Sequence, residues 1–537
     1  MNESVDNIEV DVMIVGAGFS GIYMLKKSLD LGLKAIVLDK ATDVGGTWFW
    51  NKYPGARCDV ESLEYSYSFS EELQQEWVWT ERYASQPEIQ RYLRYVVDKF
   101  SLNNYLRLRT NVKSAIYDSQ SKRWIIRCED GDIYAAKFCV MGTGCLSKPQ
   151  IPDIPGVENF SGEIYHTGAW PAEMPDFSNK NVGIIGTGSS SVQIIPIIAE
   201  NCKHLYVFQR TANFVIPALN RPIDPEVQNN HKLDYKTRRI AAKATPFCIG
   251  GHPPPLNFAT DLSPADLERT YESKWQTGGA ISFLYSFKNL LVDAVSNETA
   301  GEFVRNKIRS IVIDKETAEN LCPNDHYIGT KRLCLGNDYY ETYNRSNVSL
   351  VNIRKNPIKH IDHSSLKSTT KSYELDTLIF ATGFDAMTGS LFAIDIKGKG
   401  GIKLCESWRN GPKTYLGLMT ANFPNMFFVA GAGSPSVKSN MVCAIEQHVN
   451  WISSCIDNMR NFNQTEIECD LTAEADWTLH VAEVANSTLY PTAKSWYTGE
   501  NMLGKPRVFS PYVAGLDVYD KICQDVVSNN YKGFKFN

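Results

Sequence analysis

Two glycine-rich turns, each set between an apolar β-branched run and an amphipathic segment, limit the fold of this chain more than any other feature. The first lies in VDVMIVGAGFSGIYMLKKSLDLGLKAIVLDK and has the pattern Gly16-x-Gly18-x-x-Gly21. This order predicts a strand, a helix and a second strand. Gly16 would permit the tight turn, Gly18 would let a pyrophosphate approach the backbone, and Gly21 would let the helix pack on the sheet. Asp39 ends the second strand, where an acidic side chain can accept hydrogen bonds from a ribose. A glycine turn can be purely structural, but the strand, the helix and the acid together favour a dinucleotide site.

The second turn repeats the pattern with a different charge behind it. NVGIIGTGSSSVQIIPIIAENCKHLYVFQRT contains Gly186-x-Gly188-x-x-Ser191, and its second strand ends in Arg210 and Thr211. A carboxylate at that point would repel a 2′-phosphate, whereas arginine pairs with it bidentately. We therefore interpret the first site as an FAD site and the second as an NADP(H) site, although Arg210 taken alone can also be a solvated cation at a strand end.

Apolar strands that run into Thr-Gly pairs divide the chain. FCVMGTGCLSKPQIP and LDTLIFATGFDA are expected to cross between a first and an inserted domain. DLSPADLERTYESKW and AGEFVRNKIRSIV have helix patterns, the former with Ser263 as N-cap, Pro264 at the first helical position and Asp266 at the third. The predicted fold class is α/β, with two Rossmann-like dinucleotide-binding domains (FAD and NADP) and a helical insert in the NADP domain. The expected parts are FAD domain 1–149, NADP domain 150–219, helical insert 220–330, NADP domain 331–383 and FAD domain 384–537.

Composition excludes several other classes. The net charge of −5 gives no basic field for nucleic acid, and no apolar run is long enough to span a bilayer. The 13 cysteines are scattered without a CxxC pair, which argues against a disulfide reductase, and without a secretory leader they are expected to be reduced thiols. We expect a cytoplasmic protein that is a monomer or weak dimer, with no metal site, no membrane partner and no nucleic-acid partner.

A twelve-residue segment before the second turn is not explained by local rules. FSGEIYHTGAWP fits the pattern FxGxxxHxxxWP, carried by Phe160, Gly162, His166, Trp170 and Pro171. With GGTWFWNKYPGARCD, GTKRLCLGNDYYETYNRSNV, GSPSVKSNMV and SWYTGENMLGKPRVF, it resembles the Baeyer–Villiger monooxygenases, class B flavoprotein monooxygenases, over essentially the whole chain. The resemblance implies that this fingerprint is a connector that positions the NADPH domain on the flavin. It also implies a structural and dynamic role for His166.

The resemblance further implies the reaction. NADPH reduces FAD, O₂ adds to give a C4a-peroxyflavin, and this attacks a small-molecule ketone. The tetrahedral adduct then rearranges to an ester or lactone, and sulfoxidation is a possible side activity. Arg332 in GTKRLC matches the family's catalytic arginine, and Asp59 in GARCD matches the carboxylate that anchors it. Arginine suits an anionic oxygen because it is a fixed cation and a poor acid. Without the motif context, such a pair would more often be a surface salt bridge.

Further residues follow from the matching segments. Lys331 is expected at the 2′-phosphate, Trp496 over the nicotinamide end and Trp48 against the isoalloxazine, although each can also be an ordinary loop or core residue. The complete set expected against the cofactors is Gly16, Gly18, Phe19, Ser20, Gly21, Asp39, Lys40, Gly46, Thr47, Trp48, Tyr53, Asp59, Gly186, Thr187, Gly188, Ser189, Ser190, Arg210, Thr211, Lys331, Arg332 and Trp496.

The expected substrate pocket contains one departure from the family pattern. Its residues are Val60, Cys145, Ser436, Val437, Lys438 and Met441. Relatives mostly have an uncharged residue near Lys438, and a buried unpaired ammonium is costly, so we expect this side chain to reach solvent or an acidic group of the substrate. The alternatives are a flavin monooxygenase that oxidises only nitrogen or sulfur and a non-catalytic nucleotide-binding protein. The latter has no use for the pair of Arg332 and Asp59.

Overall fold

The computed structural model describes residues 8–537, and the first glycine turn lies in its largest sheet. The strand order is β17-β4-β5-β6-β1-β2-β3, and β18 pairs with β6 off this path. The strands are β1 (Ile8–Val15), β2 (Ala35–Leu38), β3 (Leu106–Arg107), β4 (Val112–Asp118), β5 (Arg123–Cys128), β6 (Ile133–Met141), β17 (Asp395–Lys397) and β18 (Met426–Phe428). β1 pairs in parallel with β2 and β6, as the first glycine unit predicts. Because β17 and β18 come from the last third of the chain, this sheet is completed only after the second domain has been built.

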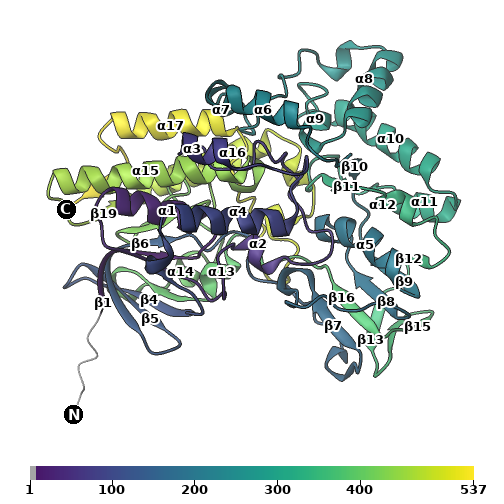
Figure 1. Cartoon of the computed structure of the whole chain (residues 1–537), viewed down its shortest axis with the longest axis horizontal. Helices are drawn as coiled ribbons and strands as arrows, with labels where there is room; N and C mark the ends of the chain where they lie inside the picture. The colour runs from purple at the N-terminus through teal and green to yellow at the C-terminus, as the bar shows by residue number, and fades with distance from the viewer. Residues whose placement is uncertain (1–7) are drawn as a thin grey trace.

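Helices from both ends of the sequence cover this first sheet. α1 (Phe19–Asp30) packs beside α15 (Met441–Asn461), and Figure 1 shows both on the same side of the sheet. The other helices of this lobe are α2 (Thr47–Trp50), α3 (Glu71–Glu76), α4 (Gln86–Lys99), α13 (Gly389–Phe392), α14 (Leu404–Ser407), α16 (Leu471–Asn486) and α17 (Leu516–Ser528). A short pair, β19 (Ile467–Cys469) and β20 (Phe534–Phe536), holds the chain end.

The second glycine turn lies in a separate parallel sheet, ordered β12-β9-β8-β16-β7. Its strands are β7 (Glu163–His166), β8 (Asn181–Ile185), β9 (His204–Gln209), β12 (Val348–Asn352) and β16 (Thr377–Phe380), and α5 (Ser189–Asn201) follows the turn. A small antiparallel sheet of β13 (Ile358–Ile361), β14 (Ser365–Ser368) and β15 (Ser372–Glu374) adjoins it. The sequence predicts the fingerprint as a connector and assigns it no secondary structure. Part of it is the edge strand β7, because its backbone pairs in register with β16 from Glu163 to His166.

The predicted helical insert is framed by two short strands, β10 (Val215–Pro217) and β11 (Cys334–Gly336), which pair in parallel. Between them lie α6 (Pro225–Leu233), α7 (Tyr235–Lys243), α8 (Pro264–Thr277), α9 (Ala280–Leu284), α10 (Ala294–Ile311) and α11 (Lys315–Leu321), with α12 (Tyr339–Thr342) just beyond. Ser263 caps α8 as expected, since its hydroxyl accepts from the Asp266 amide at 3.3 Å. The insert forms the outer layer beside the second sheet in Figure 1.

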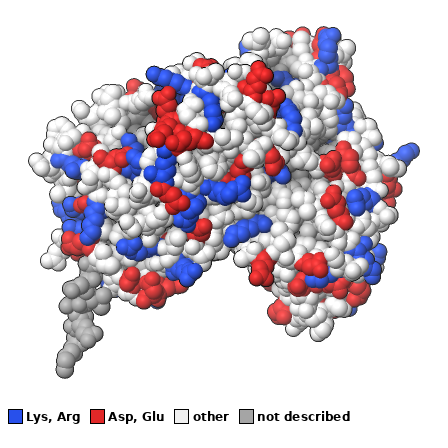
Figure 2. Space-filling view, in the orientation of Figure 1, with Lys and Arg blue, Asp and Glu red and all other residues white. Residues whose placement is uncertain are grey.

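The two crossing segments meet between the sheets. Pro149 and Phe384 form an antiparallel bridge, at the points where we expected the chain to leave and re-enter the first domain. The exact domain boundaries stay predictions. On the face seen in Figure 2, acidic and basic side chains are interspersed, and the surface is hollowed between the two lobes. None of the helices in residues 8–537 has the length and apolar character needed to cross a membrane.

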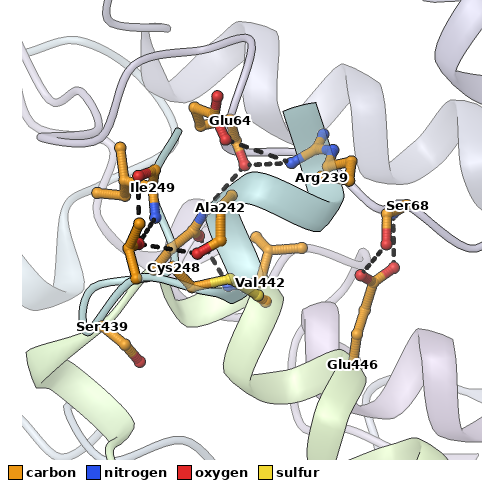
Figure 3. Close-up of a disulfide and its surroundings, with 12 residues drawn as sticks. Glu64, Ser68, Arg239, Ala242, Cys248, Ile249, Ser439, Val442 and Glu446 are labelled. Atoms are coloured by element: carbon orange, nitrogen blue, oxygen red, sulfur yellow. Dashed lines mark hydrogen bonds and ion pairs between the residues drawn. A yellow bond between two sulfur atoms is a disulfide. The ribbon is translucent and has the colours of Figure 1, made fainter. Parts of the chain in front are cut away.

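The expectation that all cysteines are free thiols is wrong for two of them. Cys248, in the loop after α7, forms a disulfide with Cys443 in the first turn of α15, with a Cα–Cα distance of 6.4 Å across a sequence separation of 195 residues (Figure 3). The pair was missed because scattered cysteines carry no sign of which ones tertiary folding brings together. The loop that carries Cys248 also accepts a backbone hydrogen bond, because the Asn440 amide donates to the Phe247 carbonyl at 2.8 Å. The helical insert is therefore fastened to the start of α15.

Candidate active site

A single cavity of about 1660 Å³ extends from the first glycine turn to the second. Of the predicted residues, it is lined by Gly16, Gly18, Phe19, Ser20, Asp39, Lys40, Gly46, Thr47, Trp48, Tyr53, Asp59, Val60, Cys145, Gly186, Thr187, Gly188, Ser189, Ser190, Arg210, Thr211, Lys331, Arg332, Val437, Met441 and Trp496. Gly21, Ser436, Lys438 and the five fingerprint residues lie outside this lining. The cavity therefore brings together segments that are more than 400 residues apart in the sequence, from Gly16 to Trp496.

The three glycines of the first turn have different roles, two structural and one facing the cavity. Gly16 has φ +110°, and a Cβ there would lie 2.4 Å from the Gly142 oxygen. A Cβ on Gly21 would lie 1.8 Å from the Gly16 oxygen, so a side chain would push α1 off the turn. A Cβ on Gly18 would meet nothing closer than 3.4 Å, at the Cα of Gly46, and both glycines line the cavity. Gly16 and Gly21 thus shape the turn, while Gly18 leaves the backbone open toward the cavity.

Asp39 is already engaged by the backbone. Its carboxylate accepts from the Ala17 amide at 2.6 Å and from the Ala41 amide at 2.8 Å. Burial raises the pKa of Asp39, and these two bonds oppose that rise. The carboxylate is therefore fixed at the cavity wall beside the first turn, where an acidic side chain can accept hydrogen bonds from a ribose hydroxyl.

The second turn opens onto a cluster of cations. A Cβ on Gly188 would meet no atom within 4 Å, and Arg210 lies exposed at the end of β9. Burial, followed by the charges of Arg354 and Arg210, lowers the pKa of Lys331, while Asp325 opposes this. Three cations thus converge at one edge of the sheet, as expected for a site that binds a phosphate.

Arg354 was missed by the sequence analysis. Its Nη2 donates to the Thr211 hydroxyl at 2.9 Å and also pairs with Asp325. A usable signal was present, because β12 pairs in parallel with β9 and both strands run into a basic residue at the same sheet edge. Gln193 was also missed: it accepts from the Tyr53 hydroxyl at 2.8 Å and so joins α5 to the first domain. No sequence signal marks this contact.

The chain's two dinucleotide sites fit their cofactors. Gly18 and Gly188 leave room at the two turns, an acid stands at the first and cations stand at the second, and the cavity joins them. When bound, FAD and NADPH supply hydride transfer and the activation of O₂.

Arg332 and Asp59 meet in the cavity between these sites. Arg332 Nε donates to Asp59 Oδ2 at 2.7 Å and Nη2 donates to Oδ1 at 2.6 Å, while Nη1 donates to the Val437 carbonyl at 3.0 Å. Burial alone would lower the pKa of Arg332, but the charge and hydrogen bonds of Asp59 outweigh it and raise this pKa. The guanidinium is therefore a fixed, permanent cation with N–H groups left to bind an anion.

The fingerprint lies behind the second turn rather than in the cavity. His166 Nδ1 accepts from the Gly168 amide at 2.9 Å, and Nε2 faces the Gln150 carbonyl at 3.2 Å. Burial lowers the pKa of His166, which favours the neutral ring. The adjacent Thr167 hydroxyl donates to Ser190 at 3.3 Å. The imidazole thus contacts the crossing segment at Gln150, while its neighbour Thr167 contacts Ser190 in the first turn of α5.

Aromatic side chains surround the end of the cavity near Arg332. Trp48 is buried and donates from Nε1 to the Tyr65 hydroxyl at 3.2 Å. Trp496 lines the cavity and contacts Tyr497, which packs with Cys145 and Val437. Burial raises the pKa of Cys145 to about 11, so this thiol stays protonated at neutral pH. Apolar side chains thus lie beside the ion pair at this end of the cavity, and polar residues of the Trp496 segment, such as Ser495 and Asn501, complete the lining.

The fold and site define a two-domain flavoprotein oxidoreductase, with a flavin site and a separate NADP site that share one cavity. A family model described as flavin-binding monooxygenase-like matches residues 9–227. The chain is 41% identical to the phenazine N-monooxygenase PhzNO1 of Lysobacter antibioticus, over 98% of this chain and 97% of that protein. It is 38% identical to a Baeyer–Villiger monooxygenase of Pseudooceanicola batsensis, over 97% of this chain and 95% of that one.

A solved structure of oxidised steroid monooxygenase bound to NADP superposes with a TM-score of 0.94 at 44% identity, covering 98% of this chain and 99% of that one. The chain belongs to the Baeyer–Villiger monooxygenase family of flavin-dependent monooxygenases. It is an FAD-containing, NADPH-dependent oxidoreductase, as the two glycine turns predicted.

Proposed function

We propose that this enzyme oxidises a small-molecule ketone to the ester or lactone, with Arg332 as the catalytic cation and Asp59 as its anchor. The observation that carries the proposal is the bidentate pair of these two side chains in the cavity that joins the two dinucleotide sites. We further propose a cytoplasmic monomer or weak dimer, in which eleven of the thirteen cysteines are free thiols and the disulfide of Cys248 and Cys443 is open to reduction.

The role of Arg332 follows from its bonds. A guanidinium has five N–H donors, and three of its nitrogens are held by Asp59 and by the Val437 carbonyl. The remaining N–H groups can donate to a negatively charged oxygen that forms at the substrate carbonyl. Because arginine does not lose its proton at physiological pH, it stabilises that oxygen without protonating it.

The rest of the site keeps the reacting groups dry and in place. Trp48, Val60, Cys145, Val437 and Trp496 present apolar surface around the ion pair. Excluding water strengthens the attraction between the guanidinium and an anionic oxygen, since the effective dielectric constant falls.

The test is product analysis with ¹⁸O₂. Purified holoenzyme, NADPH and a panel of aryl, linear and cyclic ketones should give esters or lactones that carry one labelled oxygen. Consumption of NADPH that yields only hydrogen peroxide with every ketone would refute the proposal.

N-oxidation is the second candidate, favoured by one specific observation. The relative at 41% identity is named a phenazine N-monooxygenase and matches over nearly its full length. Incubation with a phenazine in place of the ketone distinguishes the two: an N-oxide without any ester product would make nitrogen oxidation the function.

A further inference from the structure

Lys438 has no ionic partner in the described structure. It lies in the short helix Ser436–Lys438 that precedes α15, and its side chain is half-buried. Among residues 8–537, no carboxylate lies within ion-pair distance of its Nζ, this nitrogen donates no hydrogen bond, and only burial and the charge of Arg332 act on its pKa. An ammonium group withdrawn from water without a counter-ion is costly, so its presence calls for an explanation.

Two tyrosine rings hold the ammonium in place. Lys438 Nζ lies 3.8 Å from the centroid of the Tyr490 ring and 4.2 Å from that of Tyr497. Both lie on the segment that carries Trp496, and ring faces attract a cation without neutralising its charge. These contacts position the Nζ atom without supplying a counter-ion.

Lys438 also adjoins the catalytic cation. The carbonyl of the preceding residue, Val437, accepts from Arg332 Nη1 at 3.0 Å, and both Val437 and Ser439 line the cavity. Burial and then the charge of Arg332 lower the pKa of Lys438 well below its ordinary value. The lowered pKa favours the neutral amine while no anion is bound, and a bound carboxylate would favour the protonated form.

The carboxylates at this end of the cavity are already paired, and Glu500 has Arg507 as its partner at 2.9 Å. Asp59 is committed to Arg332 by two hydrogen bonds. Burial raises the pKa of Cys145 to about 11 and that of Tyr497 to about 12, so neither is an anion at neutral pH, and it raises the pKa of Tyr490 as well. When Lys438 is protonated, its charge and that of Arg332 face one carboxylate, Asp59, and an anionic ligand would supply the second negative charge.

We propose that Lys438 recognises a carboxylate on the ketone substrate, so that the preferred substrates are oxo acids rather than neutral ketones. The inference rests on the proposed function, in which the ketone carbonyl lies at Arg332. Lys438 itself lies just outside the cavity lining, whereas Val437 and Ser439 on either side of it belong to the lining. The ammonium would therefore meet the carboxylate from behind these two residues and gain the counter-ion that the protein lacks. A charge-assisted hydrogen bond of this kind separates a free acid from its neutral ester by about ten- to a hundredfold.

The test compares oxo acids with their own methyl esters. The substrates are 4-oxopentanoate, 5-oxohexanoate and 6-oxoheptanoate, each against its methyl ester, which keeps the ketone and removes only the charge. For at least one chain length, wild-type enzyme should have a kcat/KM for the acid about tenfold or more above that for the ester. Lys438→Met, which keeps the length of the side chain, should lower this ratio about ten- to a hundredfold, and Lys438→Arg should keep most of it.

A binding measurement makes the result independent of turnover. Pentanoate and its methyl ester, which carry no ketone, are titrated into the oxidised holoenzyme by calorimetry. Wild type should bind pentanoate more tightly than the ester, and Lys438→Met should lose the difference while its flavin content stays that of wild type.

The outcomes separate the two proposals. Equal kcat/KM values for acid and ester at every chain length in wild type, or an unchanged ratio in Lys438→Met, would overturn the role of Lys438 while leaving ketone oxidation intact. An equal loss for acid and ester in Lys438→Met would also overturn it, because the ammonium would then act on the reaction in general. If no ketone of either kind gives an ester, the proposed function fails, and the pentanoate titration alone decides whether Lys438 binds carboxylates.

Discussion

Removing the guanidinium of Arg332 should separate the two halves of the catalytic cycle. Arg332→Ala should still accept hydride from NADPH, because that step needs only the two dinucleotide sites. It should form almost no ester, because the anionic oxygen at the substrate carbonyl loses its fixed donor.

The size of the effect follows from the geometry. Arg332 is held at 2.7 Å and 2.6 Å by Asp59 and at 3.0 Å by the Val437 carbonyl, so its position is set before substrate binds. One preorganised donor in a water-excluded site contributes about 3–4 kcal/mol, or roughly a hundred- to a thousandfold in rate. Asp59→Ala keeps the cation but frees it to move, and a displacement of about 1 Å costs up to roughly a hundredfold. The double variant should be little worse than Arg332→Ala alone, because Asp59 acts through the arginine.

Stopped-flow spectroscopy and product analysis provide the assay. Flavin bleaching under nitrogen measures reduction, and ester formation after mixing with air measures oxygenation. Arg332→Lys is the matched control: it keeps a charge but not the planar fork, so it should fall between wild type and Arg332→Ala. The reasoning is refuted if Arg332→Ala makes ester at the wild-type rate, or if it loses reduction and ester formation to the same extent.

Four further predictions concern the cofactor, the fingerprint and stability. Arg210→Ala should raise the KM for NADPH about ten- to a hundredfold and that for NADH little, since only the 2′-phosphate contact is lost. Steady-state kinetics with both cofactors measure this, and an equal rise of the two KM values would refute it. His166→Ala should keep its FAD, measured by absorbance after gel filtration, but turn over slowly, and loss of the flavin would contradict the positioning role. Cys443→Ser should lower the free energy of unfolding by about 2–4 kcal/mol in urea, as should reductant on wild type, whereas Cys405→Ser, at an exposed free thiol, should have no effect. Burial lowers the pKa of His448 to about 3, and its Nδ1 already accepts from the Ala430 amide. Below about pH 6.5 the unfolded chain therefore binds a proton that the folded chain does not. The free energy of unfolding of wild type should then fall by about 1.4 kcal/mol per pH unit relative to that of His448→Gln. A difference between these two proteins that stays constant from pH 7.5 to 4.5 would contradict the last prediction.

Much of the fold could be predicted because its signals are local. The strand, glycine turn and helix of each unit are contiguous, and the structure confirms both units and the fold class. The cap of α8 followed for the same reason, since Ser263 and Asp266 belong to one helical turn. The charge at the end of each second strand distinguished the FAD site from the NADP site, because a ribose hydroxyl and a 2′-phosphate require opposite partners.

Contacts between distant segments could not be predicted in the same way. The disulfide of Cys248 and Cys443, the third cation Arg354 and the bond from Tyr53 to Gln193 each join segments that only the packed chain brings together. The fingerprint shows the same limit: its spacing identified the family, but only pairing with β16 made Glu163–His166 an edge strand.

The sequence by itself determined the class of this protein, because the glycine turns, the charges behind them and the fingerprint are short patterns whose chemistry does not depend on the rest of the fold. Tertiary structure alone decided the environment of each functional group. From the sequence, Lys438 could be placed in the expected substrate pocket, with solvent or an acidic group of the substrate as its alternative destinations. Its isolation from carboxylates, its two tyrosine rings and its closeness to Arg332 depend on η7 (Tyr490–Thr492), η8 (Trp496–Thr498) and the loop before β11 packing together. Burial and the neighbouring charges depend on how the chain packs in three dimensions and not on the order of residues along it. They decide what a charged side chain can bind.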